Sequence, residues 1–129
     1  MENTAEQKKA TVLVLDDEAL VADMTRKLLE KQGYAVLSAT TPGEAINMAT
    51  EFDGRIDLFL TDVGLPGMSV DEVQKRVKEI HPDAKVLYIS AYSKKSLEAE
   101  GLDINREDVI QKPLSMQNLS EKVRQTLNP

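Results

Sequence analysis

Apolar and polar residues follow two different periods along the chain, and each period predicts a different kind of element. Short apolar runs that are rich in β-branched residues are typical of strands covered on both faces of a sheet. Longer stretches carry apolar residues three or four positions apart, as amphipathic helices do. The predicted strands cover residues 11–15, 34–39, 57–61, 85–90 and 108–111. The predicted helices cover residues 19–32, 42–52, 70–80, 93–100 and 115–127.

Short sequence signals mark where the predicted helices begin and end. Thr41 and Ser69 each stand three residues before a glutamate, which is the capping-box pattern of a helix start. Pro42 then occupies the first helical position, where proline is favoured. Gly33 ends the first helix, and His81, just before a proline, ends the third. We expect His81, the only histidine, to be a solvated loop residue.

Strands and helices alternate along the whole chain, without repeats or a linker. This order predicts an α/β fold in which a five-stranded parallel sheet carries helices on both faces through right-handed crossovers. We expect the doubly wound, flavodoxin-like strand order 2-1-3-4-5. In such a sheet, ligands bind at the carboxyl ends of the strands, where the strand order reverses. That point lies between the first and third strands.

Composition limits the classes of function. The chain has 129 residues, which is the length of one domain, and its net charge of −6 without a basic block argues against nucleic-acid binding. The absence of cysteine excludes a disulfide framework and thiolate chemistry. No apolar stretch approaches the roughly 20 residues of a membrane-spanning helix. We expect a cytoplasmic protein with a flexible lead-in at residues 1–9 and a single domain at residues 10–129.

Polar side chains that can react or bind a ligand stand at the carboxyl ends of four predicted strands: Asp16, Asp17, Asp62, Ser90 and Lys112. Taken singly, each has a structural explanation as a helix cap, a turn residue or a surface lysine. Together they are harder to explain, because three converging carboxylates repel one another unless a cation lies between them. Mg²⁺ prefers one or two carboxylates, retained waters and phosphate oxygens. A metal beside a carboxylate nucleophile, facing a lysine and a hydroxyl, suits phosphoryl transfer to aspartate.

Four motifs, one at each of these strand ends, carry a family resemblance: VLVLDDE, LTDVGLPGMS, VLYISAY and VIQKPL. In this order they resemble the receiver domain of two-component response regulators, over essentially the whole chain from about residue 10. The resemblance implies that Asp62 is phosphorylated by a histidine kinase or a histidine phosphotransfer protein. It implies Mg²⁺ as the cofactor, with Asp17 as a direct ligand and Asp16 acting nearby through water. Gly64 would contribute its backbone carbonyl to the metal.

The resemblance assigns roles to residues near the two last strands as well. Ser90 matches the switch hydroxyl of the family, Lys112 its invariant lysine, and Ala91 a small residue beside the phosphoryl group. Pro113 matches a proline that usually follows a cis peptide bond. The sequence YISAY and the QKPL ending are similar to receivers attached to hybrid histidine kinases. The output partner, the oligomeric state and the question of a longer parent protein stay open.

Val109 departs from the family pattern, and Tyr92 is expected to affect the switch and the phosphoryl lifetime. Val109 stands where the family often has an aromatic switch residue, so that switch is absent or relocated to Tyr92. Tyr92 is also expected to shield the phosphoryl group from water and so to lengthen its lifetime. We expect the output surface to involve the fourth helix, the fifth strand and the fifth helix. Four methionines are expected to pack in the core or in loops: Met24, Met48, Met68 and Met116.

Two other functions remain as alternatives to the phosphoacceptor. A haloacid-dehalogenase-like phosphohydrolase also forms an aspartyl phosphate with Mg²⁺, but it needs a second aspartate where this chain has Gly64. A degenerate receiver would bind partners without phosphorylation, but such domains typically lose an acidic residue or the lysine. Nucleotide binding is disfavoured because the chain has neither a G-x-G-x-x-G nor a P-loop motif. We therefore expect a phosphoacceptor whose only reaction beyond accepting the group is self-dephosphorylation.

Overall fold

The predicted succession of strands and helices is confirmed in the part of the chain that the computed structural model describes, residues 10–65, 67–90, 109–111 and 115–128. The strands are β1 (Thr11–Leu15), β2 (Ala35–Ala39), β3 (Leu58–Asp62), β4 (Lys85–Ser90) and β5 (Val109–Gln111). The helices are α1 (Ala19–Lys31), α2 (Pro42–Glu51), α3 (Val70–Ile80) and α5 (Met116–Leu127). The helix predicted for residues 93–100 and the lead-in at residues 1–9 lie outside the described residues.

The sheet has the predicted strand order, β2-β1-β3-β4-β5, and its strand pairs are parallel. β1 therefore lies between β2 and β3, and the order reverses there, as in other doubly wound sheets. In the register, Leu15 pairs with Thr61, and Asp62 pairs with Ile89. The last residues of β1, β3 and β4 consequently meet at one edge of the sheet.

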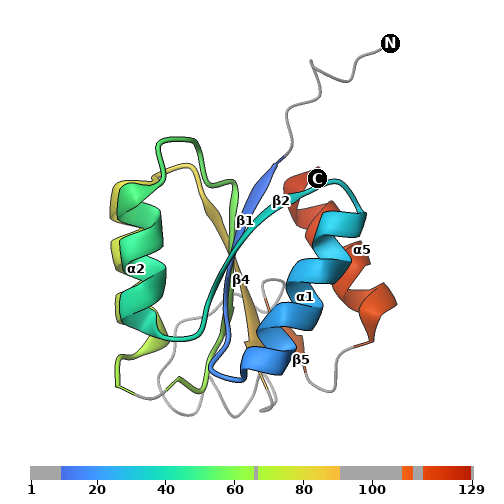
Figure 1. Cartoon of the computed structure of the whole chain (residues 1–129), viewed down its shortest axis with the longest axis horizontal. Coiled ribbons are helices and arrows are strands. Elements are labelled where there is room, and N and C mark those ends of the chain that lie inside the picture. The colour runs from blue at the N-terminus through green and yellow to red at the C-terminus, as the bar shows by residue number, and fades with distance from the viewer. Residues whose placement is uncertain (1–9, 66, 91–108, 112–114, 129) are drawn as a thin grey trace.

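Both faces of the sheet are covered, which explains why the strands are apolar without a break. Figure 1 shows α1 and α5 on one side of the strands and α2 on the other. Side chains that alternate along β1 and β3 enter two separate buried clusters, as the two-residue period of a strand requires. The cluster under α2 and α3 contains Leu13, Leu15, Ala45, Ala49, Phe59, Val73 and Val77. The cluster under α1 and α5 contains Val12, Val14, Leu29, Leu58, Leu60, Leu119 and Val123.

The helix starts follow the predicted capping chemistry at α2 and α3. The backbone N–H of Glu44 donates to Oγ1 of Thr41 at 3.1 Å, and the N–H of Glu72 donates to Oγ of Ser69 at 3.2 Å. These bonds satisfy one of the N–H groups that a helix start leaves without an intrahelical acceptor. The return bond of the capping box at α2 goes to the residue before the N-cap. Oε1 of Glu44 accepts from the N–H of Thr40 at 2.7 Å.

The prediction that His81 is a solvated loop residue was wrong. His81 is half-buried at the end of α3, and its Nε2 lies 2.8 Å from the carbonyl oxygen of Ala49 in α2. Ala49 belongs to the last turn of α2, where carbonyl oxygens lack intrahelical donors. His81 therefore links the ends of two adjacent helices instead of facing water.

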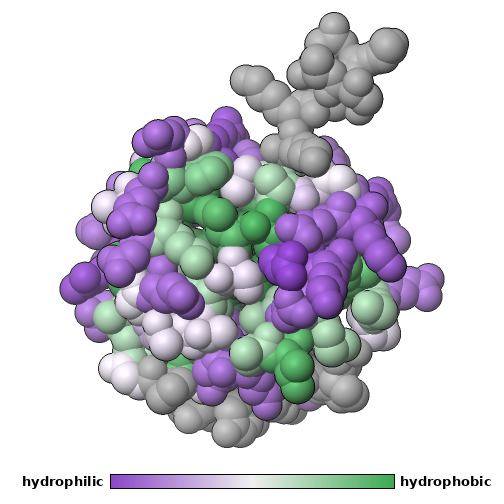
Figure 2. Space-filling model, in the orientation of Figure 1, coloured by the Kyte–Doolittle hydropathy of each residue, from purple (hydrophilic) through white to green (hydrophobic). Residues whose placement is uncertain are grey.

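The prediction that the methionines pack in the core or in loops holds for only two of the four. Met48 and Met68 pack, partly buried, against the cluster under α2 and α3. Met24 and Met116 are 57% and 55% exposed. The buried face of α1 is instead formed by smaller residues, Ala22 and Thr25, together with Leu29. Figure 2 shows apolar surface over the amino-terminal end of α1, where Leu20 is 80% exposed.

None of the helices in the described ranges combines the length and the apolar character that crossing a bilayer requires.

Asp57 fastens the amino edge of the sheet, opposite the carboxyl edge. Its Oδ2 accepts from the backbone N–H of Thr11 at 2.8 Å, and Arg55 pairs with its Oδ1 at 3.0 Å. Its own backbone N–H donates to the carbonyl of Thr11, and its carbonyl accepts from the N–H of Lys85. One residue thus joins the start of β1 to the starts of β3 and β4.

Replacing Asp57 with alanine should destabilise the fold without touching the carboxyl edge. The buried N–H of Thr11 loses its acceptor, and such a loss costs about 1–3 kcal/mol of the free energy of unfolding. Urea denaturation of Asp57→Ala against the unmodified chain measures the cost. Asp57→Asn is the matched control, because an amide oxygen can still accept from Thr11. Equal midpoints for the alanine variant and the unmodified chain would contradict the assigned role.

Candidate phosphoacceptor site

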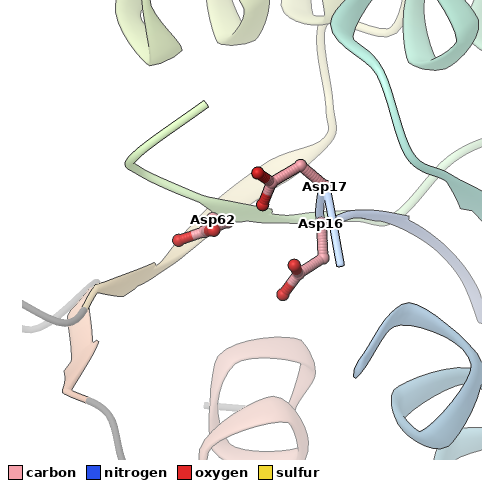
Figure 3. Close-up of side chains that lie close together, drawn as sticks. All are labelled: Asp16, Asp17 and Asp62. Atoms are coloured by element: carbon pink, nitrogen blue, oxygen red, sulfur yellow. The ribbon is translucent and has the colours of Figure 1, made fainter. Parts of the chain in front are cut away.

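Three aspartates converge at the carboxyl edge of the sheet. Figure 3 shows Asp16 and Asp17 coming from the end of β1 and Asp62 from the end of β3. One carboxylate oxygen from each residue lies within 4.8 Å of one oxygen of the other two. The sequence prediction that these side chains meet is confirmed. Parallel strand ends bring them together, because β1 and β3 are neighbours in the sheet.

The two neighbouring aspartates at the end of β1 differ in burial and in hydrogen bonding. Asp16 is 3% exposed; its backbone N–H continues the ladder to the carbonyl of Ala39, and its Oδ1 accepts from the N–H of Glu18 at 2.9 Å. Asp17 is exposed. The N-cap of α1 is Glu18, and its side chain makes no capping bond. Neither Asp16 nor Asp17 is therefore the helix cap that the structural explanation of these residues required.

Asp62 is the last residue of β3 and is 8% exposed. β3 lies between β1 and β4, and Asp62 itself pairs with Ile89 of β4. The hydroxyl of Thr61 donates to the carbonyl oxygen of Asp62 at 3.0 Å, and the N–H of Val63 continues the ladder to Ile89. The chain then turns away from the sheet, and Gly67 has a left-handed φ of 92° that favours glycine.

Gly64 follows Asp62 by two residues and is exposed. A Cβ placed on Gly64 would meet no atom within 4 Å. Steric crowding therefore does not require glycine at this position, and a side chain there would extend into open space next to the carboxyl edge. Whether its carbonyl serves a metal stays a prediction.

Ser90 ends β4 and is 1% exposed. It directly follows Ile89, the residue that pairs with Asp62, and it pairs in turn with Gln111 at the end of β5. Lys112 is the next residue after Gln111, but Lys112 lies outside the described residues. The sheet register thus brings Ser90 to the edge that carries Asp62.

Other predicted residues near β4 and β5 have mixed outcomes. Val109, at the position of the family's aromatic switch, is buried in a small cluster with Val70 and Tyr88. The start of β5 thus shares an apolar cluster with α3 and β4. Ala91, Tyr92 and Pro113 lie outside the described residues, and their assigned roles stay predictions.

The arrangement suits a hard divalent cation. Two of the three carboxylates are buried and one is exposed, so a cation held by them would keep contact with water on the side of Asp17. Mg²⁺ commonly binds in this way, with one or two carboxylates and several retained waters. The like charges also repel one another without such a cation. The donor set therefore fits the predicted metal.

One contact of the site was missed by the sequence analysis. The N–H of Glu18 fixes the carboxylate of Asp16, and the spacing of two residues is the signal of an Asx turn. The sequence analysis assigned Asp16 only a cap or a metal-linked role. The bond restricts rotation of the Asp16 carboxylate at the carboxyl edge.

Comparisons with known proteins agree with this geometry. A family model described as the response regulator receiver domain matches residues 12–124. The transcriptional regulatory protein YvrH of Bacillus subtilis (strain 168) is 31% identical over 118 residues, which cover 91% of this chain and 48% of YvrH. The sensor kinase CckA of Brucella abortus (strain 2308) is 29% identical over 119 residues, which cover 92% of this chain and 12% of CckA.

A solved structure shows the same architecture. The crystal structure of the receiver domain from the hybrid histidine kinase CckA is similar with a TM-score of 0.76 at 30% identity, covering 92% of this chain and all of that one. The chain spans about half the length of YvrH and a much smaller share of the sensor kinase. The family match, the fold and the acidic cluster lead to one assignment: the chain belongs to the response regulator receiver domain family of two-component systems.

Proposed function

We propose that Asp62 accepts a phosphoryl group from a phosphohistidine donor in the presence of Mg²⁺, and that the added charge changes a partner-binding surface. The observation that carries the proposal is the convergence of Asp16, Asp17 and Asp62 at the switch point of the sheet. Asp62 ends β3, the strand between β1 and β4, and it pairs with Ile89, the residue before Ser90. Membership of the receiver family favours a phosphoacceptor over a phosphohydrolase.

Each residue of the edge has a role in the transfer. A carboxylate oxygen of Asp62 attacks phosphorus, the new O–P bond forms, and the N–P bond to the donor histidine breaks. Asp17, Asp62 and the carbonyl of Gly64 would hold Mg²⁺, with Asp16 acting nearby. Bound Mg²⁺ neutralises part of the charge on the phosphoryl oxygens. Lys112 and Ser90 would meet the remaining oxygens, where fixed donors stabilise the charge.

The partners follow from this chemistry. The donor is a histidine kinase or a histidine phosphotransfer protein. The similarity to the receiver domain of the hybrid histidine kinase CckA supports a donor of this kind. Transfer to Asp62 places a dianion next to Ser90, which draws the hydroxyl and the following loop inward. Tyr92 would move with that loop. We propose the face formed by the helix expected at residues 93–100, β5 and α5 as the output surface.

Labelling of the chain by acetyl phosphate should depend on Mg²⁺. Three unscreened carboxylates repel an incoming phosphate, and the metal reverses that repulsion. Intact-mass spectra recorded with Mg²⁺ and with excess chelator measure the labelled fraction, and labelling is expected only with the metal. Equal labelling in both samples would contradict a metal-dependent transfer. Absence of labelling in both would indicate a receiver that acts without phosphorylation.

Phosphorylation should move the backbone near β5 as well as the site. Amide NMR shifts are compared with and without a beryllofluoride mimic of the phosphoryl group. The larger changes are expected to cluster at residues 90–112, because Ser90 and Gln111 are paired in the sheet. A switch of a few kcal/mol is enough to invert a two-state population. Changes confined to residues 62–68 would show that no switch is coupled to the site.

A further inference from the structure

Two exposed methionines from different helices border the same groove. Met24 comes from α1 and Met116 from the start of α5, and both are more than half exposed. The groove between the two helices has a volume of about 670 Å³. Its other lining residues are Lys27, Leu28, Glu30 and Lys31. The groove therefore has an apolar wall that consists largely of thioether and leucine side chains, beside two ammonium groups.

The accessible thioethers of this groove contrast with those elsewhere in the described chain. Met48 and Met68 are partly buried against the cluster under α2 and α3. Oxidation of a methionine to its sulfoxide depends on access of the oxidant to sulfur. Met24 and Met116 should therefore react before Met48 and Met68, which places the reactive pair on one surface.

Met24 is not among the buried residues that hold α1 in the described part of the chain. α1 is anchored to the core by Ala22, Thr25 and Leu29, on its opposite face. A charged network also spans α1: Arg26 bonds to Asp23 at 2.5 Å and to Glu30 at 2.9 Å. The hydrogen bond from Arg26, followed by that from Lys27, holds the pKa of Asp23 below its ordinary value. A polar group at Met24 should consequently leave the helix folded and change only its outer surface.

The groove runs from Met24 toward the carboxyl end of α1, and the first turn of the same helix lies next to the proposed phosphoacceptor site. α1 begins at Ala19, two residues after Asp17, and Leu20 is exposed on its first turn. A protein that brings a phosphohistidine to Asp62 must approach the carboxyl edge beside this turn. An amphipathic helix of that donor would cover Leu20 and Met24 with its apolar stripe. Acidic residues beside the stripe would face Lys27 and Lys31.

We propose that Met24 and Met116 form an oxidation-sensitive pair in this groove, and that their oxidation by a peroxide slows phosphoryl transfer from a protein donor. The proposal rests on the phosphoacceptor function proposed above. A sulfoxide replaces an apolar, flexible contact with a polar one, so the donor helix loses the surface it would bury. The phosphoacceptor site itself is unchanged, so transfer from a small phosphodonor is unaffected.

The oxidation step is a two-electron oxygen transfer. The lone pair of the methionine sulfur attacks one oxygen of hydrogen peroxide, the S–O bond forms and the O–O bond breaks. The departing hydroxide takes up the proton left by the transferred oxygen and becomes water. Sulfur is oxidised to the sulfoxide and the peroxide is reduced, so no further co-reactant is needed.

Peptide mass mapping after limited treatment with hydrogen peroxide tests the site. Each sulfoxide adds one oxygen, about 16 Da, to its peptide. Met24 and Met116 are expected to reach half-oxidation at least about fivefold sooner than Met48 and Met68, because they are more than half exposed. Equal rates at the four positions would overturn the assignment of a reactive pair.

The functional consequence is tested with two phosphodonors. The small donor is acetyl phosphate. The protein donor is chosen from a panel of autophosphorylated histidine kinases that includes the kinase core of CckA. The kinase that labels the untreated chain fastest is used. Peroxide treatment should reduce the initial rate from the kinase about tenfold, as expected for the loss of a central docking contact, and leave the acetyl phosphate rate unchanged. An unchanged kinase rate after full oxidation of both residues would overturn the proposal.

Substitution provides the matched controls. Leucine keeps the apolar volume and lacks sulfur, so the kinase-driven rate of the variant that combines Met24→Leu with Met116→Leu should be the same before and after peroxide treatment. Met48→Leu should remain as sensitive as the unmodified chain. Equal inhibition of the double leucine variant would show that oxidation acts elsewhere. Failure of acetyl phosphate to label the untreated chain would instead contradict the proposed phosphoacceptor function, whatever the state of the methionines.

Discussion

Asp62→Asn should abolish phosphorylation of the chain by acetyl phosphate. The amide has no carboxylate oxygen to attack phosphorus, and Asp16 and Asp17 extend from the neighbouring strand end with different surroundings. The unmodified chain should gain one phosphate, about 80 Da, in an intact-mass spectrum. The asparagine variant should gain none under the same Mg²⁺ concentration and reaction time.

The asparagine substitution has a suitable control in the same chain. Asp53 is an exposed residue after α2, so Asp53→Asn removes the same charge away from the carboxyl edge. It should be labelled like the unmodified chain. Stable labelling of the Asp62→Asn variant, with a folded circular dichroism spectrum, would contradict the choice of Asp62 as the nucleophile.

Asp17→Ala should remove the stimulation of phosphorylation by Mg²⁺ while preserving the fold. Asp17 is the exposed member of the cluster, and no buried hydrogen bond is assigned to it in the described structure. Loss of one of the carboxylates weakens the metal site, so the initial labelling rate should fall by roughly a hundredfold at millimolar Mg²⁺, a loss typical of a catalytic metal ligand. Rates measured over a series of Mg²⁺ concentrations test this expectation.

The same variant should be at least as stable as the unmodified chain without metal. Removing one of three carboxylates whose oxygens lie within 4.8 Å relieves repulsion in the folded state. Thermal unfolding in chelator and in Mg²⁺ separates the two effects, since Mg²⁺ should stabilise only the chain that binds it. An unchanged labelling rate, or equal stabilisation of both proteins by Mg²⁺, would contradict the role of Asp17.

The sheet was predictable because its strands are buried on both faces. Continuous apolar runs such as those around Leu13 and Phe59 have few alternatives, and the helices between them force parallel pairing. The faces of the helices were harder to predict. On α1, the larger apolar residues Leu20 and Met24 face solvent, while Ala22 and Thr25 face the sheet. Small residues fit a helix that packs close to β2. The large apolar side chain of Met24 was therefore wrongly expected to be the buried one.

The acidic cluster was predictable from chain order alone. Two neighbouring parallel strands end in aspartates, and their carboxyl ends must share one edge. The resemblance gave Asp16 and Asp17 different roles, but no local pattern predicted that Asp16 is buried and accepts from the backbone N–H of Glu18. It also missed the contact between His81 and Ala49, which depends on how the ends of α2 and α3 pack. Such contacts follow from tertiary structure and have no local pattern.

The position of the phosphoryl group tests the central claim most directly. The chain is labelled with acetyl phosphate and Mg²⁺, and borohydride reduces the acyl phosphate, which converts the modified aspartate to homoserine. Peptide sequencing by mass spectrometry then locates that residue. The account predicts homoserine at position 62 and an unmodified His81, Asp16 and Asp17. Homoserine at position 16 or 17, or phosphate retained on His81, would contradict it.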